Sequence, residues 1–237
     1  MKLILVKFES RRYQSAAPTA GMPWPTPTRG SPPMLHPRIK ATAILGVALA
    51  PLALTFAPAS AALEPPTPTI EIASLNGSGC PPGTVTAIPN PGSFTLKYSG
   101  HTAKLGGDAK PTDARKNCQI SLKVTLPEGL VYAVERVEHN GTANLEPTTT
   151  GSLKSMFYFA GSPQAGVYRK QIPGPVAGAW QVTERLIQLL WQRCGEQRNL
   201  NLNTELLMTS SDKSKPNSLS MNSDLGTSYH LNWKTCP

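Results

Sequence analysis

Short segments in which apolar and polar residues alternate recur along the C-terminal part of this chain. They are residues 94–98, 120–126, 200–208 and 229–233. Because successive side chains of a strand point to opposite faces of a sheet, each segment predicts a strand with one buried and one wet face. Turn-forming Pro, Gly and Asn residues separate them. About nine to eleven such strands predict an all-β chain, folded as a two-sheet antiparallel β-sandwich that is jelly-roll-like.

Two segments carry further expectations. Asn140-Gly141 lies between the segments 131–138 and 142–145, which is typical of a β-hairpin turn between two strands. The segment 182–193 is ambiguous, because Leu186 and Leu190 share a helical face with their neighbours while the run could equally enter a strand. The predicted sandwich therefore has one short helix as an alternative for 182–193.

The cysteines indicate a disulfide-bonded, exported domain. The chain has four, Cys80, Cys118, Cys194 and Cys236, and no Cys-x-x-Cys pair. An even number without metal-ligand spacing favours two disulfides over a zinc site. Four cysteines allow three pairings. We favour Cys80–Cys118 with Cys194–Cys236, and Cys80–Cys236 with Cys118–Cys194 remains the alternative.

The front of the chain reads as a secretion signal. Residues 34–61 have Arg38 and Lys40 before an apolar run that ends at the small residues Ala59-Ser60-Ala61, which is typical of a cleaved signal peptide. The apolar run is shorter than the roughly 20 residues of a bilayer span. We therefore expect an extracellular protein with no membrane span after cleavage.

The other boundaries follow from composition. Residues 1–33 are interpreted as an upstream extension or a start codon assigned too early. Residues 62–74 form a Pro/Thr-rich spacer, and 75–237 form the secreted domain, with folded structure beginning near 70–75.

The positive charge gives no case for nucleic acid as a partner. The whole chain has a formal net charge of +9, but residues 1–61 hold seven Lys/Arg against one acidic residue. The remaining residues hold sixteen basic and thirteen acidic side chains. A surplus this small does not make the basic surface that nucleic-acid binding requires.

Four motifs together resemble a known family. They are Leu-Asn-Gly-Ser-Gly-Cys-Pro-Pro-Gly-Thr-Val at 75–85, Arg-Lys-Asn-Cys-Gln at 115–119, Cys-Gly at 194–195 followed by Leu-Asn-Leu-Asn-Thr-Glu-Leu at 200–206, and Tyr-His-Leu-Asn-Trp-Lys-Thr-Cys-Pro at 229–237. Over roughly 75–237 the chain resembles the domain of unknown function 4360 family, which are secreted proteins of bacteria and fungi. The resemblance implies export and a single domain. It supplies no activity and no catalytic residue.

Two polar groups are candidate binding residues. Asp113, Arg115 and Lys116 precede Cys118, whose disulfide would hold the segment rigidly enough for recognition. A second group shares one face of a predicted strand, where side-chain amides can hydrogen-bond a sugar. Its members are Asn199, Asn201 and Asn203, followed by Glu205.

Residues for catalysis or metal binding are sparse. His101, His139 and His230 are predicted to be solvated surface residues, and no nucleophile, phosphate-loop or metalloprotease motif is present in the sequence. Calcium is the one cofactor considered. Its candidate ligands, Asp108, Asp113 and Asp224, lack the spacing of a calcium loop, so no cofactor and no metal site is predicted.

These observations rank three kinds of function. A non-catalytic extracellular binding module for a polysaccharide, a cell surface or a protein comes first. A structural or surface-associated protein without a small ligand is second. A hydrolase is third, since it needs two carboxylates facing one cleft. The sequence does not predict the oligomeric state.

Overall fold

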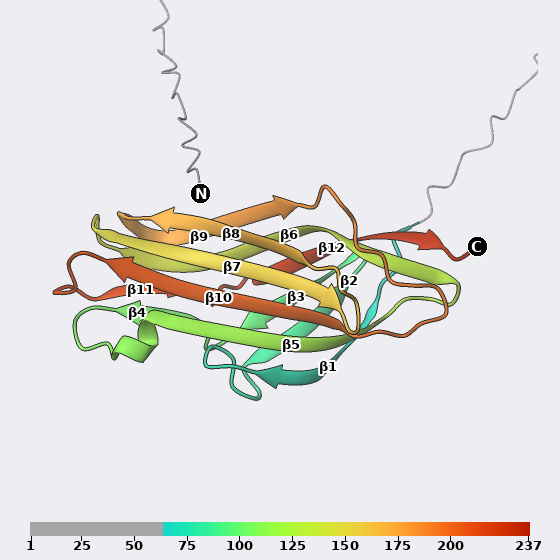
Figure 1. The fold of residues 1–237 in the computed structure, drawn as a ribbon, viewed down its shortest axis with the longest axis horizontal. Coiled ribbons are helices and arrows are strands. Elements are labelled where there is room, and N and C mark those ends of the chain that lie inside the picture. Colours follow the sequence, from blue (N-terminus) through green and yellow to red (C-terminus); the bar gives the residue numbers. More distant parts are fainter. Residues whose placement is uncertain (1–63) are drawn as a thin grey trace, which may run out of the picture. The chain divides into compact units, whose positions relative to one another are not determined.

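The structure is a computed structural model that describes residues 64–237, and the alternating segments form strands in it (Figure 1). The first sheet has five antiparallel strands. Their spatial order is β1 (Thr69–Asn76), β5 (Arg115–Thr125), β10 (Leu200–Ser210), β7 (Thr149–Phe159) and β8 (Gly166–Pro173). Buried and partly exposed residues alternate without a break along β7, as the period of two requires.

The second sheet is built around β6 (Leu130–Leu145), the longest strand among the described residues. One side of β6 pairs with β12 along its first part and with β11 along its last part, and the other side pairs with β9. β12 continues through β3 to β2, and β11 continues to β4. The bounds are β2 (Val85–Asn90), β3 (Ser93–Tyr98), β4 (Thr102–Leu105), β9 (Val176–Arg185), β11 (Asn217–Ser220) and β12 (Thr227–Thr235).

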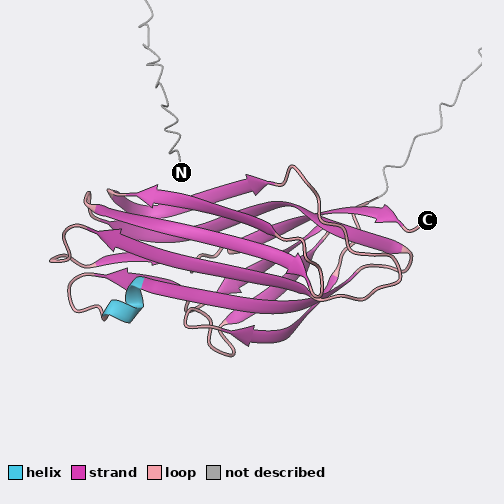
Figure 2. Ribbon diagram, in the orientation of Figure 1, coloured by secondary structure: helices cyan, strands magenta, loops and turns pink. Residues whose placement is uncertain are grey.

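The two sheets pack face to face, and their inner side chains form one core. Leu122, Leu153 and Leu202 are fully or almost fully buried on the first sheet. Phe94 and Tyr229 of the second sheet stack with ring centroids 5.0 Å apart. Fully burying side chains of this size contributes about 1.5–3 kcal/mol each. The predicted all-β antiparallel sandwich is confirmed (Figure 2).

Helical structure among residues 64–237 is limited to one 3-10 turn, η1 (Pro111–Ala114), which Figure 2 shows at the start of β5. No helix in this described part is long and apolar enough to cross a membrane. β1 begins at Thr69, within the range assigned to the spacer. The upstream extension, residues 1–33, and the signal peptide, residues 34–61, lie outside the described residues.

The predicted hairpin at Asn140-Gly141 is wrong. Both residues lie inside the continuous strand β6. The Asn140 side chain donates to the carbonyl oxygen of Gly226 at 3.0 Å and accepts from Gln181 at 3.1 Å. A Cβ on Gly141 would lie 2.0 Å from the carbonyl oxygen of Ser220. Packing against distant strands therefore keeps these residues extended, although the dipeptide favours a turn.

The ambiguous segment 182–193 contains no helix. Its first residues complete β9, and the chain then forms a loop that returns to β6 through a bridge between Trp191 and Ala133. Leu186 and Leu190 pack against the core, whereas Ile187 is completely exposed. The apolar residues Leu186 and Leu190 thus pack at the edge of the second sheet without forming a helix.

Candidate functional site

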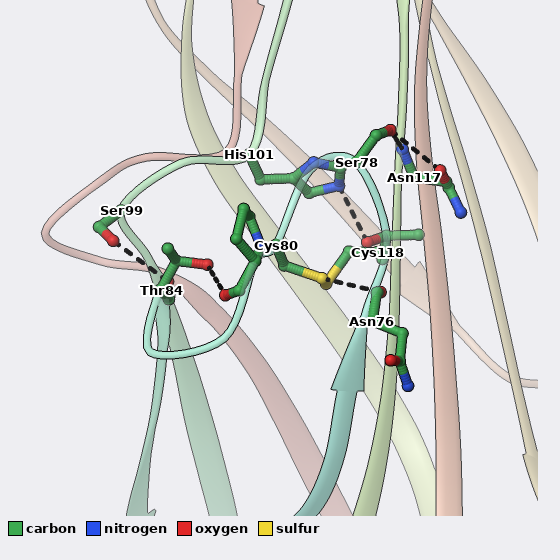
Figure 3. Close-up of a disulfide and its surroundings, with 10 residues drawn as sticks. Asn76, Ser78, Cys80, Thr84, Ser99, His101, Asn117 and Cys118 are labelled. Carbon is green, nitrogen blue, oxygen red and sulfur yellow. Dashed lines mark hydrogen bonds between the residues drawn. A yellow bond between two sulfur atoms is a disulfide. The ribbon is translucent and has the colours of Figure 1, made fainter.

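The strand β5 is fixed to the start of the domain by the first disulfide (Figure 3). Cys80 and Cys118 are fully buried, with their Cα atoms 5.3 Å apart. The turn before Cys80 needs its two glycines. Gly77 has a φ of +124°, and a Cβ on Gly79 would lie 2.0 Å from Nδ1 of His101. The motif around Cys80 therefore brings the chain close enough to close the disulfide against β5.

The second disulfide joins Cys194 to Cys236. The pairing favoured from the sequence is the one that the structure has. Cys194 is exposed and Cys236 half-buried, so this bond lies at the surface.

The outer face of the first sheet carries a three-by-three grid of side chains on β5, β10 and β7, which lie side by side in Figure 1. Residues directly opposite each other in antiparallel strands share a face, so the strand register defines the rows. The rows are Asn117–Glu205–Lys154, Gln119–Asn203–Met156 and Ser121–Asn201–Tyr158. We call these nine residues the polar platform.

Several amides of the polar platform are free to bind a ligand. Asn117 accepts a hydrogen bond from the hydroxyl of Ser78 at 3.0 Å. Within residues 64–237, by contrast, no protein hydrogen bond engages the side-chain amides of Gln119, Asn201 and Asn203. Each amide offers two donors and an acceptor oxygen. The first two of these rows also line a hollow of about 170 Å³, which Arg115 lines as well.

The charges of the polar platform are partly compensated. Arg115 donates from Nε to Oε2 of Glu205 at 2.8 Å, and Glu205 is the one carboxylate among the nine residues. Lys154 lies opposite Glu205 in the register, yet the two do not form an ion pair. The side chain of Lys154 therefore remains an available cation beside the hollow.

The sequence of the folded domain identifies its family. A family model described as domain of unknown function (DUF4360) matches residues 66–236. The chain belongs to the DUF4360 family. The resemblance inferred from the four motifs is thereby confirmed.

Other comparisons place this DUF4360 chain among known proteins. An uncharacterized secreted protein of Arthroderma benhamiae is 28% identical over 171 residues, which cover 69% of each chain. Among solved structures, TmCBM61 in complex with β-1,4-galactotriose aligns with a TM-score of 0.28 and 11% identity, covering 69% of this chain and 88% of that one. A similarity of this size carries no argument about function.

The structure separates the three charged residues that the sequence grouped before Cys118. Arg115 lies on the outer face, where it binds Glu205 and lines the same hollow as Asn203. Asp113 is in η1, and Lys116 donates to it at 2.9 Å, so these two charges satisfy each other. Lys116, followed by the backbone N–H of Lys110, lowers the pKa of Asp113. In this DUF4360 domain only Arg115 of the three adjoins the polar platform.

The predicted asparagine row is partly engaged. Asn201 and Asn203 lie on the polar platform, whereas Asn199 precedes β10 and donates to the hydroxyl of Ser121 at 3.1 Å. Gln119, Lys154 and Tyr158 were not among the residues predicted from the sequence. Their positions on alternating strands indicate their face, but only the register shows which strands lie beside β10.

The prediction that His101 and His139 are solvated is wrong, because both are fully buried in the core of the DUF4360 domain. His101 Nε2 lies 3.1 Å from the hydroxyl of Thr204, and His139 Nδ1 lies 3.1 Å from that of Thr227. Burial lowers the pKa of His101 to about 4. Burial, followed by the nearby His101, lowers the pKa of His139 to about 3. Both rings are therefore neutral at physiological pH.

His230 lies half-buried on the outer face of the second sheet. Its Nδ1 is 3.1 Å from a guanidinium nitrogen of Arg136, and its Nε2 is 3.5 Å from Glu138. The pKa of His230 is lowered, first by desolvation and then by Arg136. It faces away from the core, as predicted, and contacts charged neighbours there.

Metal ligands do not cluster in the described part of the chain. Among residues 64–237, no three His, Cys, Asp or Glu side chains are grouped so that they could hold a metal ion. Asp108 and Asp113 border one hollow beside β4, whereas Asp224 belongs to the loop before β12. The three aspartates considered for calcium therefore do not form one site.

Proposed function

We propose that this protein is exported and acts outside the cell as a non-catalytic glycan-binding module, with the polar platform as its binding surface. The observation that carries the proposal is the grid of unengaged amides of Gln119, Asn201 and Asn203 on adjacent strands. Amide groups offer donors and acceptors together, which matches the hydroxyl groups of a sugar. Strands also hold these groups more rigidly than loops do.

An aromatic ring adjoins the amides. Tyr158 lies directly opposite Asn201 and is half-exposed on the same face. An aromatic side chain combines an apolar ring face with a polar tip. The apolar face of a sugar ring can pack on Tyr158 while its hydroxyl groups bond to the neighbouring amides.

The proposed extracellular location has independent support. The relative from Arthroderma benhamiae is a secreted protein. Both disulfides need an oxidising compartment to form and persist. The apolar segment within residues 34–61 supplies a matching export signal in the sequence.

The test is a pull-down of the secreted protein on insoluble cellulose, chitin, xylan and cell wall. We expect saturable retention on at least one matrix. Asn201→Ala should weaken retention roughly fivefold, and Asn201→Ala with Asn203→Ala more than about tenfold, because each loses hydrogen bonds to the ligand. Asn144→Ala is the matched control, since Asn144 is an exposed asparagine on the second sheet.

The outcomes separate the candidate functions. Retention that the platform variants weaken and Asn144→Ala leaves unchanged supports the glycan-binding module. Absence of retention on every matrix, together with absence of binding to soluble acidic polysaccharides, contradicts it, and measurement of self-association by sedimentation would then test the structural alternative.

A further inference from the structure

Two cations lie side by side on the outer face of the first sheet. Lys154 of β7 is directly opposite Arg169 of β8, so both side chains share that face. Like charges directly opposite each other in a sheet destabilise it. Within the described residues, neither forms an ion pair. An anionic ligand bound between the two side chains would be attracted by both cations and would offset their mutual repulsion.

The neighbouring carboxylate does not neutralise the pair. Glu205 lies on the other side of Lys154, but its carboxylate is bound by Arg115. The row that crosses β10, β7 and β8 therefore has the single carboxylate of Glu205 against Lys154 and Arg169, and Arg115 of β5 adds a third cation beside that carboxylate. Its local charge is positive although the domain as a whole is only weakly basic.

Several cations on nearby strands and on the second sheet have partners. Lys170, the residue after Arg169, contacts Glu184 at 2.8 Å. On the second sheet, Arg136 pairs with Glu138, and Arg185 pairs with Glu135. Within residues 64–237, lysines without an ion pair also occur on other strands, as Lys97 of β3 does. Lys154 and Arg169 differ from Lys97 in being two cations directly opposite each other, and Lys154 also lines the hollow of about 170 Å³.

We propose that the polar platform selects an acidic glycan. Lys154, together with Arg169 on the neighbouring strand β8, binds the carboxylate groups of its uronic acid residues. The inference rests on the proposed glycan-binding function and assigns its ligand class. Adjacent strands place the two cations about 5 Å apart at their backbones, so one carboxylate can contact both. The guanidinium of Arg169 can bind it through two hydrogen bonds, while Lys154 acts as a point charge beside the amides.

The test compares one polymer in two charge states. Affinity electrophoresis or calorimetry is performed with polygalacturonate and with fully methyl-esterified polygalacturonate, at low and at physiological salt. We expect the acidic form to bind at least about tenfold more tightly, and the difference to shrink as salt screens the charges. Lys154→Gln with Arg169→Gln should abolish the difference, whereas Lys97→Gln, an exposed lysine on the second sheet, should retain it.

Each result decides between the proposals. Equal binding of both polymers, or an acid preference that survives Lys154→Gln with Arg169→Gln, overturns the acidic-glycan assignment and leaves glycan binding standing. Binding of dextran sulfate without binding of polygalacturonate also overturns it, because the anion would then be a sulfate ester. Failure to bind any acidic or neutral glycan overturns the proposed function itself.

Discussion

At the scale of single residues, the buried histidines show how neutral polar side chains are accommodated in this core. His101 and His139 bond to threonine hydroxyls on strands of both sheets. A neutral imidazole can both donate and accept, so each ring can be placed between the sheets without a charge. In the sequence both lie beside turn residues, and only the tertiary packing reveals that they face inward.

The first prediction concerns acid stability. The pKa values of His101 and His139 in the folded protein, about 4 and about 3, lie below the 6.5 of an unfolded chain. The unfolded chain therefore binds more protons in this range, and stability is fully present above pH 6.5. It should fall as the pH decreases toward 4 and then 3, by at most about 3–5 kcal/mol for each ring.

Urea unfolding at pH 7, 5 and 4 measures this loss. His101→Gln should flatten the pH dependence, whereas His230→Gln, which removes a half-buried surface ring, should change it much less. NMR titration of the wild-type protein provides a second measurement. If the His101 and His139 imidazoles titrate near pH 6.5, the buried neutral state is refuted.

The second prediction concerns the turn before Cys80. Gly79→Ala should destabilise the domain by about 3 kcal/mol or prevent folding, because its Cβ would overlap the ring of His101. Gly83→Ala is the matched comparison. Gly83 has a φ of +83° but nothing within 4 Å of the Cβ that alanine would add, so it should lose only about 1–2 kcal/mol from backbone strain. Chemical denaturation compares the two, and equal losses would show that the contact with His101 is unimportant.

At the scale of secondary-structure elements, periodicity predicted strands well and their partners poorly. The alternating segments 94–98, 120–126, 200–208 and 229–233 all lie in strands, namely β3, β5, β10 and β12, or extend just beyond one. Periodicity reports which face of a strand is buried, and it carries no information about its neighbours. The polar platform was therefore predicted only on β10, since β5 and β7 contribute the rest through a register that sequence does not reveal.

The third prediction concerns the pairing of β7 with β8. Lys154→Gln should raise the free energy of unfolding by about 0.2–1 kcal/mol, because it removes the repulsion from Arg169 across the strands. Lys170→Gln should not stabilise, since Lys170 forms an ion pair with Glu184. Thermal unfolding at low salt measures both variants. A destabilising Lys154→Gln would mean that the lysine already has a favourable partner.

The fourth prediction concerns the order in which the disulfides are reduced. Cys80 and Cys118 are completely buried, whereas Cys194 is exposed. A thiolate must reach a sulfur atom in order to attack it. Mild dithiothreitol should therefore reduce Cys194–Cys236 first, and alkylation followed by peptide mass spectrometry identifies the freed thiols. Simultaneous reduction of both bonds would imply that the folded state opens as a whole.

At the scale of the whole molecule, β6 joins the parts of the second sheet. It contacts β12 and β11 on one side and β9 on the other, so neither group of strands forms a separate unit. Its length could not be predicted, because Asn140-Gly141 favours a turn locally. The contacts with Gly226 and Ser220 that keep these residues extended come from about 80 residues further along the chain.

The disulfide pairing has a consequence for the covalent connectivity of the protein. One bond closes residues 80–118 and the other closes 194–236, so neither crosses the middle of the chain. A single protease cut in the exposed loop 161–165 would therefore produce two polypeptides with no covalent link. Their strands would nevertheless interleave, because β10 of the second polypeptide lies between β5 and β7 of the first. We expect the nicked protein to migrate as one species on a native gel and as two on a denaturing gel without reductant. The two fragments would then form a non-covalent complex that keeps the fold of the intact domain.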